Sequence, residues 1–133
     1  MEAIEAHAAE TYPEECCGFL IGTPETPARV ASVRRARNIA ETNRERRYVI
    51  DPLEQLSVEK ALDVTREAIL GFYHSHPNHP AEPSEFDRTH AVPWYTWYVI
   101  LSIVDRKPAS LRAWSFDGAA SAFRPETLTV DEP

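Results

Sequence analysis

The stretch Ile69–Pro77 reads Ile-Leu-Gly-Phe-Tyr-His-Ser-His-Pro and is apolar until it reaches two histidines. A short apolar run of this kind indicates a buried strand. Because successive side chains of a strand point to opposite faces, His74 and His76 leave one face and Ser75 leaves the other. Two imidazoles side by side at the end of a buried strand suit a metal ion such as zinc. The sequence therefore predicts a metal site at the end of this strand.

A third ligand is expected shortly after the histidines. A catalytic zinc ion usually has three protein ligands and an open position for water. Asn78, Pro80 and Pro83 predict a loop that turns the chain back, and Ser84 then begins a helix, with an acid three residues later. Asp87, in the first turn of that helix, can supply the third ligand.

A metal-bound water that attacks a carbonyl group also needs a base to take its proton. The attacked carbonyl needs a hydrogen-bond donor for the oxyanion that develops on it. Glu15, placed just before the apolar run 17–22, is the candidate base, and its neighbour Glu14 is the alternative. The Ser84 hydroxyl is the candidate donor. Ser84 and Asp87 also match a capping box, in which the serine hydroxyl caps the helix and is less free for catalysis.

The rest of the chain alternates helical and strand patterns. We expect a helix over residues 1–12 and a second over 51–67, which has Asp51 as its N-cap and Pro52 at its first position. The run 98–104 is the strongest strand and should be central. Intermingled strands and helices indicate an α/β fold, a sheet with helices packed on it. The other expected strands are 17–22, 28–38, 48–50, 111–116 and, more weakly, 120–124.

Composition indicates a globular protein with one domain over residues 1–133. Hydrophobic residues make up 43% and charged residues 26%. No run approaches the roughly 18 apolar residues of a membrane span, and the acidic start 1–5 lacks the basic region of a signal peptide. The adjacent Cys16 and Cys17 are not a disulfide framework and are expected to fill the core. These features predict a cytoplasmic protein with no membrane partner.

The net charge of −7 argues against nucleic acid as a partner, because binding phosphate needs a basic face. Residues 29–47 nevertheless hold seven arginines against two glutamates. This basic segment could be a solvated face, as most charge runs are, or a docking patch for an acidic surface.

The spacing of these residues resembles the signature of the JAMM (MPN-plus) zinc metallopeptidases, in its short prokaryotic form. The two histidines are followed by seven residues (77–83), Ser84, two more residues and Asp87, and residues 13–22 resemble the family's glutamate-bearing segment. The resemblance extends from about Glu2 to Trp114. It implies a single curved mixed sheet of the MPN and cytidine-deaminase-like type, with helices packed on it.

The resemblance also implies a role for each matching residue. His74, His76 and Asp87 would bind Zn²⁺, and Ser84 would stabilise the tetrahedral intermediate. Glu15 would be the general acid and base, because it lies three residues before Gly18 as in the family pattern.

Short relatives act on ubiquitin-like or sulfur-carrier proteins that end in Gly-Gly, so such a protein is the expected substrate. Relatives usually have a strand before the first helix. The sheet here would either lack that strand or receive it from a second copy in a homodimer.

Other interpretations of the same residues are weaker. A non-catalytic MPN scaffold characteristically loses ligands, whereas all five positions are filled here. A two-histidine, one-carboxylate iron oxygenase would place its acid close after the first histidine. A zinc deaminase would need Pro-Cys-x-x-Cys, which the sequence lacks. His79 and His90 could support the site, although solvent exposure is the simpler expectation, and Trp94, Trp97 and Trp114 are expected to pack in or around the core.

Overall fold

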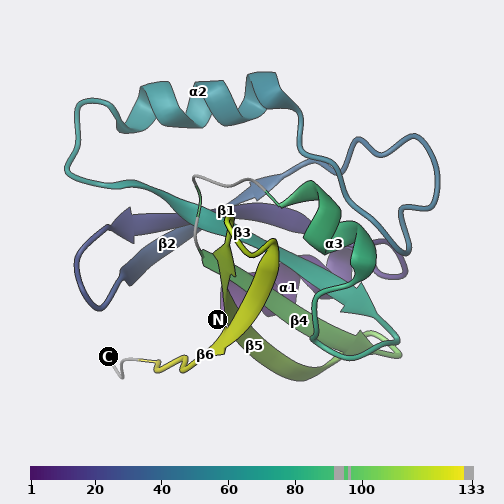
Figure 1. Cartoon of the computed structure of the whole chain (residues 1–133). Helices are drawn as coiled ribbons and strands as arrows, with labels where there is room; N and C mark the ends of the chain where they lie inside the picture. The colour runs from purple at the N-terminus through teal and green to yellow at the C-terminus, as the bar shows by residue number, and fades with distance from the viewer. Residues whose placement is uncertain (92–94, 96, 131–133) are drawn as a thin grey trace.

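The computed structural model describes residues 1–91, 95 and 97–130. In this part of the chain, one mixed sheet has the strand order β2-β1-β3-β4-β5-β6 (Figure 1). Strands β3 and β4 are parallel, and every other neighbouring pair is antiparallel. The helices are α1 (Glu2–Thr11), α2 (Pro52–Leu62) and α3 (Glu85–His90). The strands are β1 (Cys17–Thr23), β2 (Arg29–Ala36), β3 (Ala68–Pro77), β4 (Trp97–Val104), β5 (Lys107–Asp117) and β6 (Ala122–Glu126).

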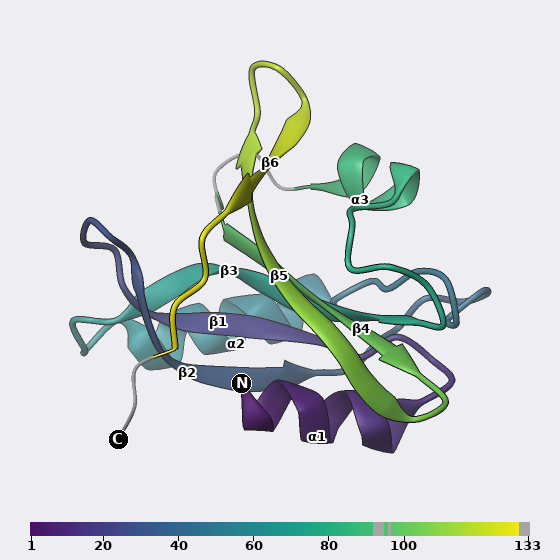
Figure 2. The same ribbon diagram turned by 90° about the horizontal axis from the view of Figure 1, so that it is seen from below.

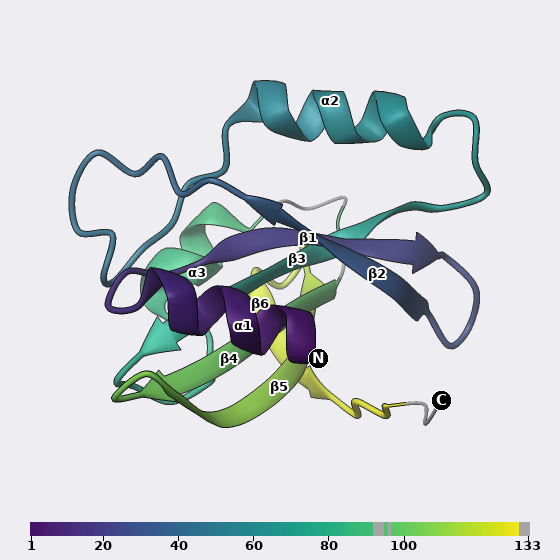
Figure 3. The same cartoon turned by 180° about the vertical axis from the view of Figure 1, so that it is seen from behind.

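The sheet separates two hydrophobic clusters. Helix α1 lies across one face, and its residues Ile4 and Ala8 pack with Tyr73 of β3 (Figures 2 and 3). Phe72, the next residue along β3 toward the N-terminus, belongs to the cluster on the other face, together with Val58 of α2. This alternation of neighbouring side chains confirms the strand period that the sequence predicts for Ile69–Pro77. Both faces of β3 are therefore covered, and its carboxyl end carries the two histidines.

A buried hydrogen bond connects α1 to the central strand. The Tyr73 hydroxyl lies 2.8 Å from Nδ1 of His7, and the two rings meet edge to face. Burial lowers the pKa of His7 to about 4, so this imidazole is neutral near pH 7.

Glycine at position 71 permits β4 to approach β3 closely. Gly71 is opposite Trp97 in the parallel pair, and a Cβ atom at position 71 would lie 1.6 Å from the Trp97 carbonyl oxygen. Any larger residue would push the two strands apart at the start of β4. The glycine therefore helps to set the register that places β4 beside the histidines.

The structure confirms most of the elements expected from the sequence and corrects three. The helix expected over 51–67 has its predicted Asp51 cap but ends at Leu62. Thr65 causes this early end, because its backbone N–H and its side-chain hydroxyl both donate to the Leu62 carbonyl, and its hydroxyl also accepts from the Glu67 N–H. A threonine hydroxyl competes with the helix for backbone partners in this way.

The strand expected over 48–50 is also wrong. Only an isolated bridge joins Ile50 to Asn38, because the N–H of Val49 donates to the Asn38 side chain instead of to a neighbouring strand.

Strand β5 begins four residues earlier than the sequence predicts. Asp105 and Arg106 both have positive φ, at 50° and 68°, and form a tight two-residue turn between β4 and β5. Such turns usually contain Asn-Gly or Asp-Gly, so Asp105-Arg106 is not a pattern that predicts a turn.

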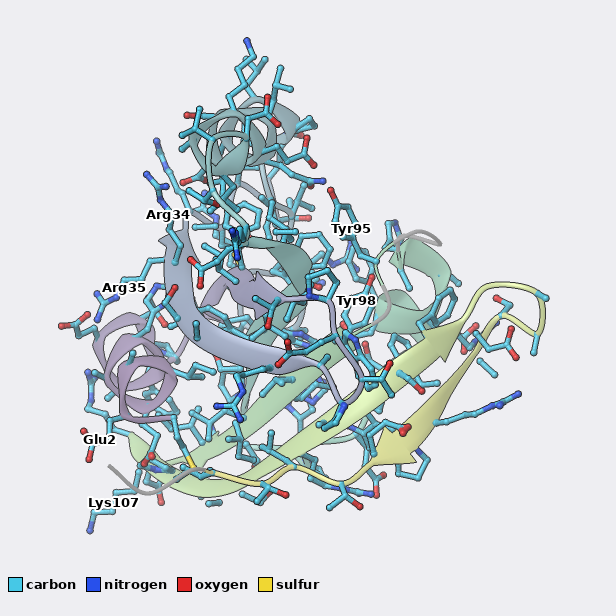
Figure 4. All side chains as sticks on the ribbon, turned by 90° about the vertical axis from the view of Figure 1, so that its left-hand side faces the viewer. Glu2, Arg34, Arg35, Tyr95, Tyr98 and Lys107 are labelled. Atoms are coloured by element: carbon cyan, nitrogen blue, oxygen red, sulfur yellow. The ribbon has the colours of Figure 1, made fainter. Side chains whose placement is uncertain are left out.

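The arginines of the basic segment 29–47 do not gather on one face. Arg34 and Arg35 leave β2 on opposite sides, and Arg35 pairs with Glu10 of α1 (Figure 4).

No helix among the described residues is long and apolar enough to cross a membrane.

Candidate metal centre

Three side-chain atoms converge at the end of β3. The Nε2 atoms of His74 and His76 lie 3.1 Å apart, and each lies 3.1 Å from Oδ2 of Asp87. All three side chains are buried, with 7% exposure for Asp87 and 1% or less for the histidines. The structure thus brings together the three ligands that the sequence proposes.

The cap of α3 fixes the aspartate. The Ser84 N–H donates to Oδ2 of Asp87 over 2.9 Å, and the Asp87 N–H donates to Oγ of Ser84 over 3.0 Å. This reciprocal pair is the capping box that the sequence predicts. Because Oγ of Ser84 accepts in this pair, its own O–H remains able to donate to another oxygen. Capping and stabilising an oxyanion are therefore compatible for this serine.

The hydrogen bonds of His76 show that the three atoms fit a cation. Nδ1 of His76 lies 2.7 Å from the Pro80 carbonyl and must carry the proton that it donates. In the neutral ring, Nε2 is then a bare acceptor facing a carboxylate oxygen. Two acceptors at this distance repel each other unless a proton or a metal ion lies between them. Two imidazole nitrogens and one carboxylate form a donor set that zinc and similar transition metals bind.

Electrostatics keep Asp87 ionised. Burial opposes the charge, but His74 and His76 and the Ser84 N–H outweigh it, so the pKa of Asp87 is well below its usual range. The ring of Tyr48 stacks on His74 with 4.6 Å between centroids and fixes the plane of that imidazole. The triad is therefore oriented in advance of any ligand.

Glu15 lies beside the triad. Its side chain is 1% exposed, and its Oε1 has no hydrogen-bond partner among the described residues. One of its carboxylate oxygens lies within 4.8 Å of a ring nitrogen of His76. Burial raises the pKa of Glu15 to about 8, with His76 lowering it and Asp87 raising it. Glu14, the alternative base, is exposed, so only its neighbour is directed into the site.

Asn38 holds this glutamate, and sequence reasoning missed it. Its Nδ2 donates to the carbonyls of Glu15 and Arg47, and its Oδ1 accepts from the N–H groups of Ala40 and Val49. One amide side chain thereby ties the backbone of Glu15 to the loop that carries Tyr48. No spacing or periodicity singles out an asparagine in an arginine-rich segment, so only the fold shows this position.

An apolar pocket adjoins the aspartate. Its lining includes the aromatic residues Tyr48, Phe72, Phe86 and Tyr98, with Asp87 at one side. Tyr98 and Tyr95 both lie in the region between α2 and α3 (Figure 4). The guanidinium of Arg47 covers the Phe86 ring at 4.7 Å. The pocket can accept an apolar group close to the candidate metal ligands.

The surroundings of the remaining candidate residues show where each of them lies relative to the site. His79 is half-buried and stacks on His76 with 4.1 Å between centroids, so it belongs to the site. His90 is exposed, but it stacks on Phe86 and lines the pocket beside Asp87. Cys16 and Cys17 are buried free thiols, and burial raises the pKa of each, as expected for core residues. Trp114 is buried and donates to the Ala81 carbonyl, and Trp97 is half-buried. Trp94 lies outside the described residues.

The mixed sheet, with two histidines and an aspartate meeting at the end of a central strand, agrees with the MPN type of domain that the sequence resembles. Residues 1–117 match the family model described as prokaryotic homologs of the JAB domain, and the chain belongs to this family. JAB and JAMM are names for the same type of domain, so the resemblance seen in the sequence is confirmed.

Named relatives agree with this assignment. The chain is 37% identical over 125 residues to the CysO-cysteine peptidase of Mycobacterium tuberculosis, covering 91% of this chain and 82% of the relative. It is 33% identical over 135 residues to the desampylase of Haloferax volcanii, covering 98% and 91%. A Desulfitobacterium hafniense protein of known solution structure superposes with a TM-score of 0.84 at 29% identity, covering 100% and 89%. The chain is thus a peptidase of the JAB type, a hydrolase, with a candidate metal-binding triad.

Replacing Asn38 by aspartate should change the position of Glu15 and leave the candidate metal ligands in place. Aspartate has nearly the same shape but cannot donate to the Glu15 and Arg47 carbonyls, and each lost partner costs about 1–3 kcal/mol. We expect a lower unfolding free energy, lower peptidase activity and unchanged metal content. Asn43→Asp, an exposed change in the same loop, is the control, and equal effects of the two substitutions would contradict the assignment.

The raised pKa of Glu15 predicts how stability depends on pH. Between pH about 4.5 and about 8, the folded chain keeps a proton that the unfolded chain has lost. The metal-free wild type should therefore lose stability as pH rises through this window, and Glu15→Gln should not.

The measurement is urea denaturation of both chelator-treated proteins at pH 5 and pH 8.5. Their difference should grow by a few kcal/mol, at about 1.4 kcal/mol per unit of pKa. Glu14→Gln, which changes an exposed carboxylate, is the control. A Glu15→Gln variant whose stability runs parallel to that of the wild type would show that Glu15 is solvated.

Proposed function

We propose that this chain is a zinc-dependent peptidase or isopeptidase of the cytoplasm. Its substrate would be a ubiquitin-like or sulfur-carrier protein, cleaved at the amide bond after a C-terminal Gly-Gly. The observation that carries the proposal is the buried triad of His74, His76 and Asp87, with the carboxyl group of Glu15 next to it. The names of the relatives, a CysO-cysteine peptidase and a desampylase, support a protein conjugate as the substrate.

The triad would hold Zn²⁺ through two neutral nitrogens and one carboxylate oxygen. When bound, zinc acts as a Lewis acid that acidifies a water ligand and polarises the scissile carbonyl. The Pro80 carbonyl keeps His76 in the tautomer that leaves Nε2 bare, and the Ser84 N–H keeps Asp87 ionised and in place. These contacts to the ligands are the supports that usually set affinity at a zinc site.

Glu15 would be the proton carrier. A cation on the triad favours the ionised form of a nearby carboxyl group and offsets the effect of burial on its pKa. The carboxylate would take a proton from the attacking water and pass it to the departing amine. The Ser84 hydroxyl, whose hydrogen is not used by the cap, would donate to the oxyanion that forms on the attacked carbonyl.

The surroundings of the site support a protein tail as substrate. The pocket lined by Tyr48, Phe72, Phe86 and Tyr98 would receive an apolar side chain of the substrate beside Asp87.

Strands β2 and β6 form the two edges of the described sheet, and a second copy of the chain could pair with either edge in a homodimer. A catalytically silent scaffold is disfavoured, because this chain keeps every residue that the chemistry needs.

Glu15 should be needed for turnover and not for binding zinc. Glu15→Gln keeps the shape of the side chain but removes the base, so hydrolysis of a Gly-Gly-linked ubiquitin-like fusion should fall by about 10²–10⁴-fold. Zinc content, measured by elemental analysis, should stay near one equivalent at low free zinc. His76→Ala should lose that zinc because it removes a ligand.

The matched control is Glu14→Gln, which alters the exposed neighbour and should leave turnover nearly unchanged. A crippled Glu14→Gln enzyme beside an active Glu15→Gln enzyme would move the base by one residue. Full zinc content in His76→Ala would refute the ligand set.

A further inference from the structure

A second group of potential metal ligands overlaps the first. One carboxylate oxygen of Glu15, one ring nitrogen of His76 and one ring nitrogen of His79 lie within 4.8 Å of one another. Glu15 and His79 are outside the triad of His74, His76 and Asp87. The two groups share only His76, so any ion held by Glu15 and His79 would lie immediately beside the triad.

Two hydrogen bonds and a stacking contact hold His79 in place. Its Nδ1 donates to the Pro77 carbonyl over 2.9 Å, and its own carbonyl accepts from the Ser102 hydroxyl over 2.7 Å. Its ring stacks on His76 at an angle of 20° between the planes. As with His76 and Pro80, a backbone carbonyl fixes the proton on Nδ1 and leaves Nε2 bare. A metal-binding histidine characteristically donates its other N–H in this way.

Glu15 provides a second and independent observation. Its Oε1 is buried and has no hydrogen-bond partner among the described residues. Burying a carboxylate oxygen without a partner is costly, and a cation nearby removes that cost. A proton carrier needs one free oxygen, and the same free oxygen makes the residue a ready metal ligand.

We propose that Glu15 and His79 bind a second divalent cation of the zinc type, and that this second ion inhibits the enzyme. The proposal rests on the proposed function, because inhibition follows from Glu15 being the base. An ion bound to the Glu15 carboxylate prevents it from accepting a proton. His76 has one bare nitrogen and can ligate only one ion, so the second ion has two protein ligands and water completes its coordination.

The donor chemistry selects the ion. One imidazole and one carboxylate suit zinc, copper or nickel, whereas Mg²⁺ and Ca²⁺ prefer oxygen ligands alone. The second site should also be weaker than the first. It has fewer protein ligands, and two dications in adjacent positions repel each other. The enzyme would therefore be active with one zinc ion and progressively inhibited as free zinc rises.

The first test measures binding, separately from activity. Metal-free protein is dialysed against increasing free Zn²⁺, and bound zinc is measured by elemental analysis. We expect wild type to bind one equivalent at low free zinc and a second at higher free zinc. His79→Gln and Glu15→Gln should keep the first equivalent and lose the second. Glu14→Gln removes an exposed carboxylate next to Glu15, and it should still bind two.

The second test follows hydrolysis of the Gly-Gly-linked fusion as free zinc increases. The concentration of zinc that halves the rate should rise at least roughly tenfold in His79→Gln, which loses a ligand of the inhibitory ion. In Glu14→Gln it should match wild type. Excess Mg²⁺ should not inhibit any of these proteins.

The results distinguish a failure of the second metal site from a failure of the proposed peptidase function. A wild type that binds only one zinc, or a His79→Gln variant that binds two or is inhibited like wild type, would overturn the second site and leave the proposed peptidase intact. A wild type that holds no zinc at low free zinc would overturn the proposed function and the second site together.

Discussion

The approach of three acceptor atoms to within 3.1 Å of one another, in the interior of the protein, is the constraint that the rest of this structure has to satisfy. Two imidazole nitrogens and a carboxylate oxygen do not meet in an apolar interior unless the rest of the fold holds them there. The strand period of β3 directs both histidines to one face, and the α3 cap delivers the aspartate to the same point. The hydrophobic clusters on both faces of the sheet stabilise the backbone that carries them. Because those clusters do not depend on the ligands, the fold should persist without the metal.

Around this centre, each hydrogen bond has a definite consequence for chemistry. The carbonyl groups of Pro80, in the loop after β3, and of Pro77, at the end of β3, fix the tautomers of His76 and His79. The Ser84 backbone keeps Asp87 ionised. Glu15 differs from these residues, because one of its oxygens is left without a partner. That oxygen is suited to move a proton, and it is also the point at which a second ion would bind. The same unpaired oxygen of Glu15 would thus serve in proton transfer and make the enzyme sensitive to excess metal.

Much of the site could be predicted from the sequence because its residues lie close together in local patterns. The two histidines share a strand face, and Ser84 and Asp87 share a helix cap, so spacing alone groups them. Glu15 is distant in sequence, and the family resemblance was needed to prefer it to Glu14. Asn38 and the stacking of His79 depend on contacts between segments that no local period encodes. The helix end at Leu62 was missed for a related reason, because a single threonine hydroxyl outweighed the helical pattern that follows.

Zinc X-ray absorption spectroscopy of the protein loaded with one equivalent identifies the atoms that hold the ion. We expect a first shell of nitrogen and oxygen at about 2.0–2.2 Å, with the multiple-scattering pattern of two imidazoles. His74→Ala and His76→Ala each remove a ligand and should lose the bound zinc. A sulfur shell near 2.3 Å, indicating Cys16 or Cys17, or a spectrum of oxygen ligands without imidazole, would contradict the assignment of the triad.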